Sequence, residues 1–225
     1  MKLPASGVIS DRNFQPSIHA KAFFTLSSPY PELYDFVPFG PFQTLQSFLE
    51  HLSIKFQSNP SAVLFVVLDK TRGSDAPEST LTTALAGVMA LILSDPINLK
   101  TEIGAILILP SFQRTHVTSN AVGLLLHYTL ELPARGGLGL RRVQWQTHEF
   151  NTASIRAAKR LGFKLEGVLR WDRALPEGKK GDAMEEREGD ANSRRPGRHT
   201  VMLSLCWDDW ETQREIVKRI MDRKR

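Results

Sequence analysis

The stretch NTASIRAAKRLGFKLEG, residues 151–167, holds the start of a helix, its end and a returning strand in one short segment. Asn151 is a favourable N-cap, because its side chain accepts a hydrogen bond from a free N–H of the first helical turn. Apolar side chains recur at helical spacing and predict one buried face, at Ile155, Ala158 and Leu161. Gly162 suits the C′ position, where a left-handed residue ends a helix. The segment therefore predicts a capped helix followed by a strand at 163–170.

A strand, a loop and a long helix precede this segment. The apolar run at 101–109 predicts a buried strand, Pro110 stops it, and a helical pattern covers 118–132. A helix N-terminus offers unpaired N–H groups and partial positive charge, which suit a pyrophosphate. The loop adds the cation of Arg114 and two hydroxyls, Thr115 and Thr118. On this unit alone, an ordinary capped helix is the favoured interpretation.

The remaining patterns predict one α+β domain over residues 1–225, with a mixed central sheet flanked by helices. A helix begins at Gln43 or Thr44 and ends before Asn59–Pro60. Further strands are expected at 62–68, 84–93, 142–147 and 200–206, and a C-terminal helix at 207–225 with Trp210, Ile216, Val217 and Ile220 available for packing. The first two of these strands form a hairpin. Residues 176–199 carry many charges and almost no large apolar side chain, so we expect a mobile loop there.

Composition narrows the functional class. The chain has 225 residues and a formal net charge of +5, with a mean hydropathy of −0.23. No apolar run approaches the ~18–20 residues that span a bilayer, and residues 1–11 lack the apolar segment expected of a secretory signal. The single cysteine, Cys206, has no internal disulfide partner, so a cytoplasmic location is expected. The basic charge suits an anionic cofactor better than nucleic acid, because the sequence contains no nucleic-acid-binding motif.

Residues 151–167 resemble the pattern Asn-x-x-Ser, then Ala-x-x-Leu-Gly-Phe-x-x-Glu-Gly, of the GNAT N-acetyltransferases. The upstream loop, Gln113 to Thr118, stands where this family binds the pyrophosphate of coenzyme A, although His116 and Thr118 replace the usual small residues. The Phe-Gln-Arg-Thr-His form of 112–116 and the segment 37–42 resemble the Rim-type branch, which acetylates ribosomal proteins. The resemblance spans about 36–205, and it implies a sheet splayed between the family's fourth and fifth strands, here 101–109 and 142–147.

The resemblance also implies site residues. It implies that Ser154 protonates the leaving thiolate, and a second helix-capping hydroxyl is an equally weighted alternative. Glu102 is the candidate general base, against a solvent-facing Glu at a strand end. The residues expected to bind acetyl-CoA are Leu107, Ile108, Leu109, Gln113, Arg114, Thr115, His116, Val117, Thr118, Asn151, Ser154 and Arg156. For Asn151 the simpler alternative is an N-cap alone. No metal is expected.

The implied function is acetyl transfer from acetyl-CoA to a primary amine, on a small molecule or a protein N-terminus. A non-catalytic module that binds coenzyme A or a partner is the alternative, and a nucleic-acid-binding protein is a third. The acceptor site is expected between 23–56 and 176–199, where Phe36, Phe39 and Phe42 suggest an apolar rim and His199 is either a lining residue or solvated. A monomer or a homodimer is expected.

Overall fold

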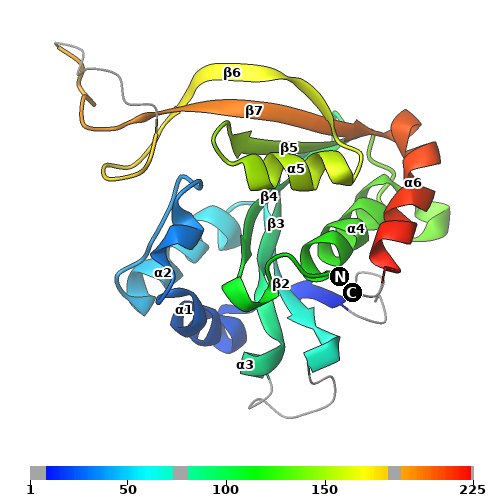
Figure 1. Ribbon diagram of the computed structural model, residues 1–225, viewed down its shortest axis with the longest axis horizontal. Coiled ribbons are helices and arrows are strands. Elements are labelled where there is room, and N and C mark those ends of the chain that lie inside the picture. The colour runs from blue at the N-terminus through cyan, green and yellow to red at the C-terminus, as the bar shows by residue number, and fades with distance from the viewer. Residues whose placement is uncertain (1–8, 73–80, 182–188, 224–225) are drawn as a thin grey trace.

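The computed structural model describes residues 9–72, 81–181 and 189–223. Its centre is one seven-stranded sheet in the order β1-β2-β3-β4-β5-β7-β6 (Figure 1). The strands are β1 Ile9–Asn13, β2 Val63–Asp69, β3 Leu85–Asp95, β4 Lys100–Ile108, β5 Arg142–His148, β6 Lys164–Ala174 and β7 Gly197–Cys206. All neighbours are antiparallel except β4 and β5, which are parallel. The sheet is therefore mixed and the fold is α+β, as the sequence predicts.

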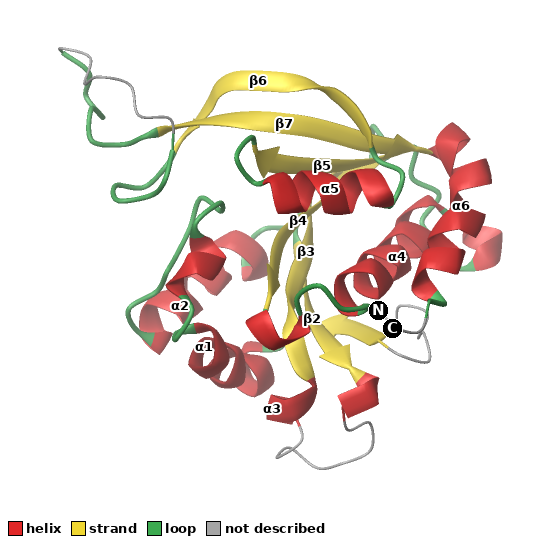
Figure 2. Ribbon diagram, in the orientation of Figure 1, coloured by secondary structure: helices red, strands yellow, loops and turns green. Residues whose placement is uncertain are grey.

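Helices cover both faces of the sheet. They are α1 Lys21–Ser27, α2 Leu45–Leu52, α3 Leu81–Ala84, α4 Val117–Leu130, α5 Thr152–Arg160 and α6 Trp207–Met221. Figure 2 shows α1 and α2 on one side of β2–β4, and α4 and α6 on the other. The predicted start of α2 is confirmed, since the Thr44 hydroxyl accepts a hydrogen bond from the Ser47 N–H at 3.1 Å.

Most predicted elements are confirmed, and the main omission is at the N-terminus. The hairpin of β2 and β3 forms with antiparallel pairing from Val63–Leu91 onward. Strand β1 has no counterpart in the prediction. It pairs along the edge of β2, from Ile9–Asp69 to Asn13–Phe65. A short strand with a mixed sequence leaves little periodic signal, and the long-range pairing that stabilises it is invisible to a local pattern.

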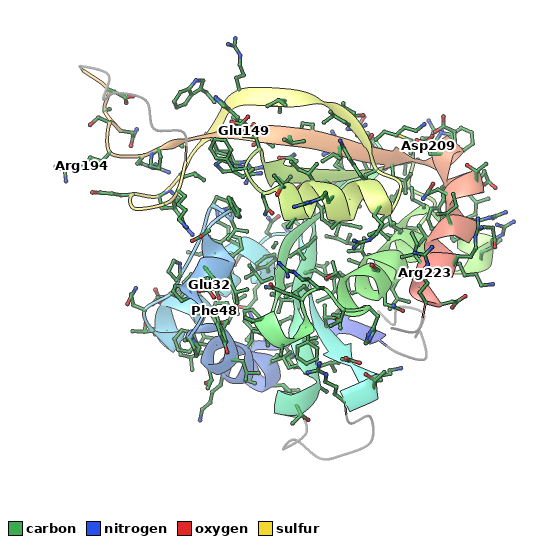
Figure 3. All side chains as sticks on the ribbon, in the orientation of Figure 1. Glu32, Phe48, Glu149, Arg194, Asp209 and Arg223 are labelled. Carbon is green, nitrogen blue, oxygen red and sulfur yellow. The ribbon has the colours of Figure 1, made fainter. Side chains whose placement is uncertain are left out.

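Strands β6 and β7 form a long hairpin across one end of the molecule (Figure 1). The prediction of a loop over 176–199 is wrong at its C-terminal end, because β7 begins at Gly197, which pairs with Ala174. Backbone pairing with β6 orders this part of the chain without any apolar pattern. Arg194 lies out at the tip of the hairpin (Figure 3). Residues 182–188 of the expected loop lie outside the described residues, and its mobility stays a prediction.

Helix α6 packs against α4, as the C-terminal pattern predicts. Trp210 and Val217 are buried, and Ile220 packs against the core. The prediction that Ile216 packs is wrong, because 40% of its surface is exposed. The Asn120 side chain on α4 donates to the Met221 carbonyl at 3.2 Å. None of the described helices has both the length and the apolar character needed to span a bilayer.

Candidate active site

The site begins at a seam in the sheet, where β4 and β5 separate. The two strands pair only at Lys100–Arg142, Thr101–Val143 and Glu102–Gln144. Beyond Glu102 these two fully described strands form no further pairs, which confirms the expected splay. A cavity of about 530 Å³ opens there. Its walls come from β4, β5, the start of α5, the β6–β7 hairpin, the tail of α2 and the segment 36–39.

A β-bulge shapes the wall on β4. Val88 pairs with Leu107 and Ala90 with Gly104, so Ala105 and Ile106 together face the single residue Met89. Ala105 has φ +50°, and both bulge residues line the cavity. An extra residue in one strand loses its ladder partner and bends the strand. The bulge therefore takes Ala105 and Ile106 out of the regular register with β3, next to the cavity.

The expected cofactor-binding residues of this strand lie beyond the bulge. Leu107, Ile108 and Leu109 are buried and do not line the cavity. The Leu109 N–H donates to the Ala86 carbonyl at 2.9 Å, so it is not available to a ligand. The cavity wall on β4 is Glu102–Ile106 instead. The sequence contained one sign of this bulge, namely Gly104, because an isolated glycine inside a strand pattern suggests a bulge.

Glu102 is buried in the middle of the cavity wall, with 3% of its surface exposed. Its Oε2 has no hydrogen-bond partner among the residues that the structure describes. Burial raises the pKa of Glu102 to about 7, against the opposing positive charges of Arg173 and Arg198. The solvent-facing alternative is therefore wrong. A carboxyl group with such a pKa is suited to exchanging protons near neutral pH.

Ser154 lies across the seam from Glu102, in the first turn of α5, and also lines the cavity. Asn151 is the N-cap of this helix, and its Oδ1 accepts a hydrogen bond from the Ser154 N–H at 3.0 Å. The indole N–H of Trp145 donates to the Ser154 Oγ at 2.9 Å. A hydroxyl has one proton to donate and two lone pairs. Trp145 uses a lone pair, which leaves the Ser154 proton available to another acceptor.

The loop before α4 is held by hydrogen bonds from its own side chains to nearby backbone carbonyl groups. The Gln113 side chain donates to the Ile108 carbonyl at 2.9 Å, and the Thr115 hydroxyl donates to the Phe112 carbonyl at 2.6 Å. Arg114 adopts φ +60°. The helix starts after His116 with no capping hydrogen bond from that side chain. Gln113 and Thr115 therefore shape the loop, while the N-terminus of α4 keeps its partial positive charge.

A small hollow of about 60 Å³ lies at the N-terminus of α4. Its lining includes three arginines, Arg114, Arg160 and Arg223, together with Thr115, His116 and Ser119. Arg160 comes from α5, and Arg223 follows α6 (Figure 3). The chemistry is that of a phosphate site, with guanidinium groups around a helix N-terminus. The sequence prediction included Arg114, Thr115 and His116 and missed the other two arginines, which come from distant segments.

The other expected residues have local roles in the structure. The buried Val117 N–H donates to the Thr115 hydroxyl at 3.3 Å, and Thr118 is half-buried in the first turn of α4. The Arg156 guanidinium is exposed and bonds to Thr152, one turn earlier in α5. The His116 Nε2 lies 3.4 Å from Asp69 Oδ1, near enough for an ion pair when the imidazole is protonated. None of Val117, Thr118 and Arg156 lines the cavity or the hollow.

The acceptor side of the cavity is partly as predicted. Phe36 and Phe39 line it, but Phe42 packs inside, with its ring centroid 5.2 Å from that of Phe48. His199 also does not line it, and its Nδ1 accepts from the Trp171 N–H at 2.8 Å. The lining includes His51, Phe56, Arg195 and Arg198, which fall in the two segments expected to form the acceptor site but were not singled out there, and Trp145 and Arg173, which fall outside both segments. Only the tertiary structure brings them together.

Comparison with known proteins agrees with this geometry. The family model described as acetyltransferase (GNAT) domain matches residues 12–164. A GCN5-related N-acetyltransferase from Brucella melitensis shares the fold, with a TM-score of 0.76, 23% identity, and coverage of 98% of this chain and 85% of that one. No curated protein matches the chain at a significant level.

Two further solved structures share the fold at lower identity. A Vibrio cholerae spermidine N-acetyltransferase in complex with CoA and spermine has a TM-score of 0.64 and 16% identity, covering 91% of this chain and 98% of that one. The Salmonella typhimurium enzyme that modifies the N-terminal serine of ribosomal protein L7/L12 has a TM-score of 0.66 and 20% identity, covering 92% and 99%. The family match spans about two thirds of the sequence, and the chain therefore belongs to the GNAT acetyltransferase family.

Proposed function

We propose that this chain transfers an acetyl group from acetyl-CoA to a primary amine, by direct attack of the amine on the thioester. The observation that carries the proposal is the pair of side chains at the seam. Glu102 has an unpartnered buried carboxylate oxygen, and Ser154 has a hydroxyl proton to donate, and both line one cavity. The transfer needs one group that accepts a proton and one that returns it.

The described residues fit coenzyme A. The hollow at the N-terminus of α4 has the donors for phosphate groups, in Arg114, Arg160 and Arg223. The seam leaves strand edges that are unpaired beyond Glu102 and Gln144, with a mixed polar and apolar lining that suits an amide-bearing arm. When bound, acetyl-CoA supplies the acetyl group as an activated thioester.

The chain's own residues then have three tasks. Glu102 removes a proton from the ammonium form of the acceptor, because only the neutral amine is nucleophilic. Ala105 and Ile106 form the bulge in the cavity wall, and their backbone N–H groups stabilise negative charge that develops on the acetyl oxygen. Ser154, oriented by Trp145, donates its proton to the departing sulfur and regains one from the second proton that the nitrogen loses as the amide forms.

A non-catalytic module is the alternative that the sequence left open. Such a module has no use for a buried carboxyl group with an unpartnered oxygen, because an unpartnered polar atom costs stability. Glu102 therefore favours catalysis over binding alone.

Two measurements test the proposal. Calorimetry with acetyl-CoA should show binding, and mass spectrometry should show acetyl transfer to amines from a broad panel. Glu102→Gln should bind the cofactor but lose most transfer, while Glu211→Gln, an exposed glutamate on α6, should behave as wild type. Absence of binding at millimolar acetyl-CoA, or transfer undiminished in Glu102→Gln, would contradict the proposal.

A further inference from the structure

The side chains that line the cavity carry more positive than negative charge. Among the described residues that line it, four are cationic, namely Lys55, Arg173, Arg195 and Arg198, and one, Glu102, is acidic. A polyamine, which carries several positive charges, would meet repulsion here. A cavity with this balance suits an acceptor that brings negative charge with its amine.

The four cations are not equivalent. Lys55 and Arg195 are exposed, and Arg195 donates to the carbonyl groups of Leu175 and Ala174. Arg173 is engaged with the Asp172 carboxylate at 3.1 Å and the Gln146 side chain at 2.6 Å. These three cations are therefore either screened by water or already bonded within the chain.

Arg198 is different. It lies on β7 opposite Arg173 of β6 and is only 4% exposed, and no described residue forms a hydrogen bond with its Nε. Burying a guanidinium is costly unless an anion pairs with it. Glu102 and Asp172 attract Arg198 electrostatically, but within the described residues no carboxylate forms an ion pair with it within 4 Å. Asp172 accepts hydrogen bonds from Arg173 and Thr200 instead. Arg198 therefore lines the cavity with a buried N–H that no carboxylate of the described residues accepts.

The rest of the lining gives the acceptor its apolar side. Phe36, Phe39 and Phe56 form one wall with His51, whose ring centroid is 4.7 Å from that of Phe39. Burial, reinforced by the nearby positive charge of Lys55, lowers the pKa of His51 to about 4. His51 is therefore neutral at physiological pH and adds no positive charge to this wall.

We infer that the acceptor is an amine that also bears a carboxylate, with its amine at Glu102, its carboxylate at Arg198 and its apolar part against Phe36 and Phe39. This inference rests on the proposed function. Two sources share this chemistry, a free amino acid and a peptide with an acidic residue near its N-terminus. They differ in where the carboxylate stands relative to the reacting amine, so matched acceptors can separate them.

The experiment uses the native protein with acetyl-CoA and pairs of acceptors that differ in one charge. The twenty free amino acids are compared with their carboxamides and with spermidine, and short peptides carrying aspartate at position two or three are compared with the asparagine forms. We expect kcat/KM to fall roughly 10–100-fold when the carboxylate becomes an amide, because a charge-assisted hydrogen bond is lost. A preference confined to free amino acids or to acidic peptides identifies the source.

Substitutions at Arg198 test whether this residue binds the carboxylate of the acceptor. Arg198→Gln should abolish the discrimination between acid and amide, and Arg198→Lys should retain part of it, because a lysine keeps the charge without the planar fork. Arg194→Gln removes an exposed charge from the same hairpin and should leave the discrimination intact. If Arg198→Gln fails to fold, the comparison of acceptors on the native protein still decides.

Several results would overturn the inference. Equal rates for acids and amides, or a preference for spermidine, would refute it while leaving acetyl transfer established. Discrimination that persists in a folded Arg198→Gln protein would also refute it. Failure of the proposed function is distinguishable, because then acetyl-CoA would not bind in calorimetry and no amine of either kind would be acetylated.

Discussion

At the scale of single residues, Glu102 links the fold to the chemistry. It follows two residues that pair β4 with β5, and it lies at the last pair before the strands part. Its neighbours on β4 are Thr101 and Ile103, which are both buried. The carboxyl group is therefore held by a paired strand while it faces the cavity, where burial raises its pKa to about 7.

The pKa of Glu102 predicts the pH dependence of acetyl transfer. Only the ionised carboxylate accepts a proton, so kcat/KM should rise with pH up to about 7, with a slope near one, and then level off. Glu102→Gln should lose this rise of kcat/KM with pH, and its rate should fall by about 10²–10⁴-fold. Initial rates between pH 5.5 and 9 test this, and a Glu102→Gln profile that keeps the same limb would rule out the assignment.

The same pKa predicts a pH-dependent stability. Glu102 has a pKa of about 7 in the folded protein against 4.5 as the ordinary value, so the folded state holds a proton that the unfolded state has released between these values. Wild type therefore loses stability as pH rises through this window, by roughly 3 kcal/mol. Glu102→Gln should be the more stable protein at pH 8 and about equal at pH 4. Urea unfolding at both pH values measures the difference, and equal differences at the two pH values would contradict it.

Ser154 and Trp145 form the other residue-scale pair. Ser154→Ala removes the proton donor, and we expect kcat to fall about 10²-fold with little change in KM for acetyl-CoA. Trp145→Phe removes the hydrogen bond that orients Ser154 and shortens a buried ring, but it keeps the Ser154 hydroxyl, so its effect on kcat should be smaller. Steady-state kinetics with thermal unfolding as the folding control separates these effects. A larger loss of kcat in Trp145→Phe than in Ser154→Ala would contradict the orientation role.

At the scale of elements, capping and turn chemistry made α5 predictable. Asn151 accepts the Ser154 N–H, and Gly162 has φ +96° with the Gln213 side chain where a Cβ would stand. Each of these features is decided by a few neighbouring residues, so the sequence shows them. Strand β1 and the first residues of β7 are decided by pairing with distant strands, and no local pattern marks them.

The segment that carries Phe36 and Phe39 depends on Gly40. Gly40 has φ +56°, and a Cβ there would collide with the Tyr34 ring. Gly40→Ala should destabilise the protein by more than the ~1 kcal/mol that a positive φ alone costs, and should raise KM for the amine. Gly136→Ala is the matched control, since its φ is +83° and nothing lies near its added Cβ. Equal destabilisation of the two variants in urea unfolding would show that the contact with Tyr34 is unimportant.

At the scale of the whole molecule, α6 ties the end of the chain to α4. Trp210 is 1% exposed, and its indole N–H donates to Glu131 at 3.2 Å. Trp210→Ala should reduce the free energy of unfolding by about 3–5 kcal/mol through the cavity it leaves. Trp207→Ala, at a position that is 57% exposed, should cost well under 1 kcal/mol. Comparable losses in the two variants, measured by urea unfolding, would show that α6 is not packed as described.

The sequence predicted the parts of the site that belong to single segments. Glu102, Asn151 and Ser154 were identified and all line the cavity. Arg198 fell in a segment expected to line the acceptor site but was not singled out, and Trp145 was predicted only as part of a strand. Arg198 was predicted to lie in a loop, because a charged side chain is not expected at a buried position of a strand. A lone buried charge is visible only once its surroundings are known.

The seam between β4 and β5 has one more consequence. An unpaired strand edge on the outside of a protein is a template for pairing with another chain and so promotes aggregation. Here two such edges face one another within the sheet, flanked by β3 and β7, which pair with the outer sides of β4 and β5. Unlike the outer edges at β1 and β6, they do not lie at the rim of the sheet, where a second protein molecule could add a strand. The fold thus keeps open backbone for recognition while withholding it from self-association.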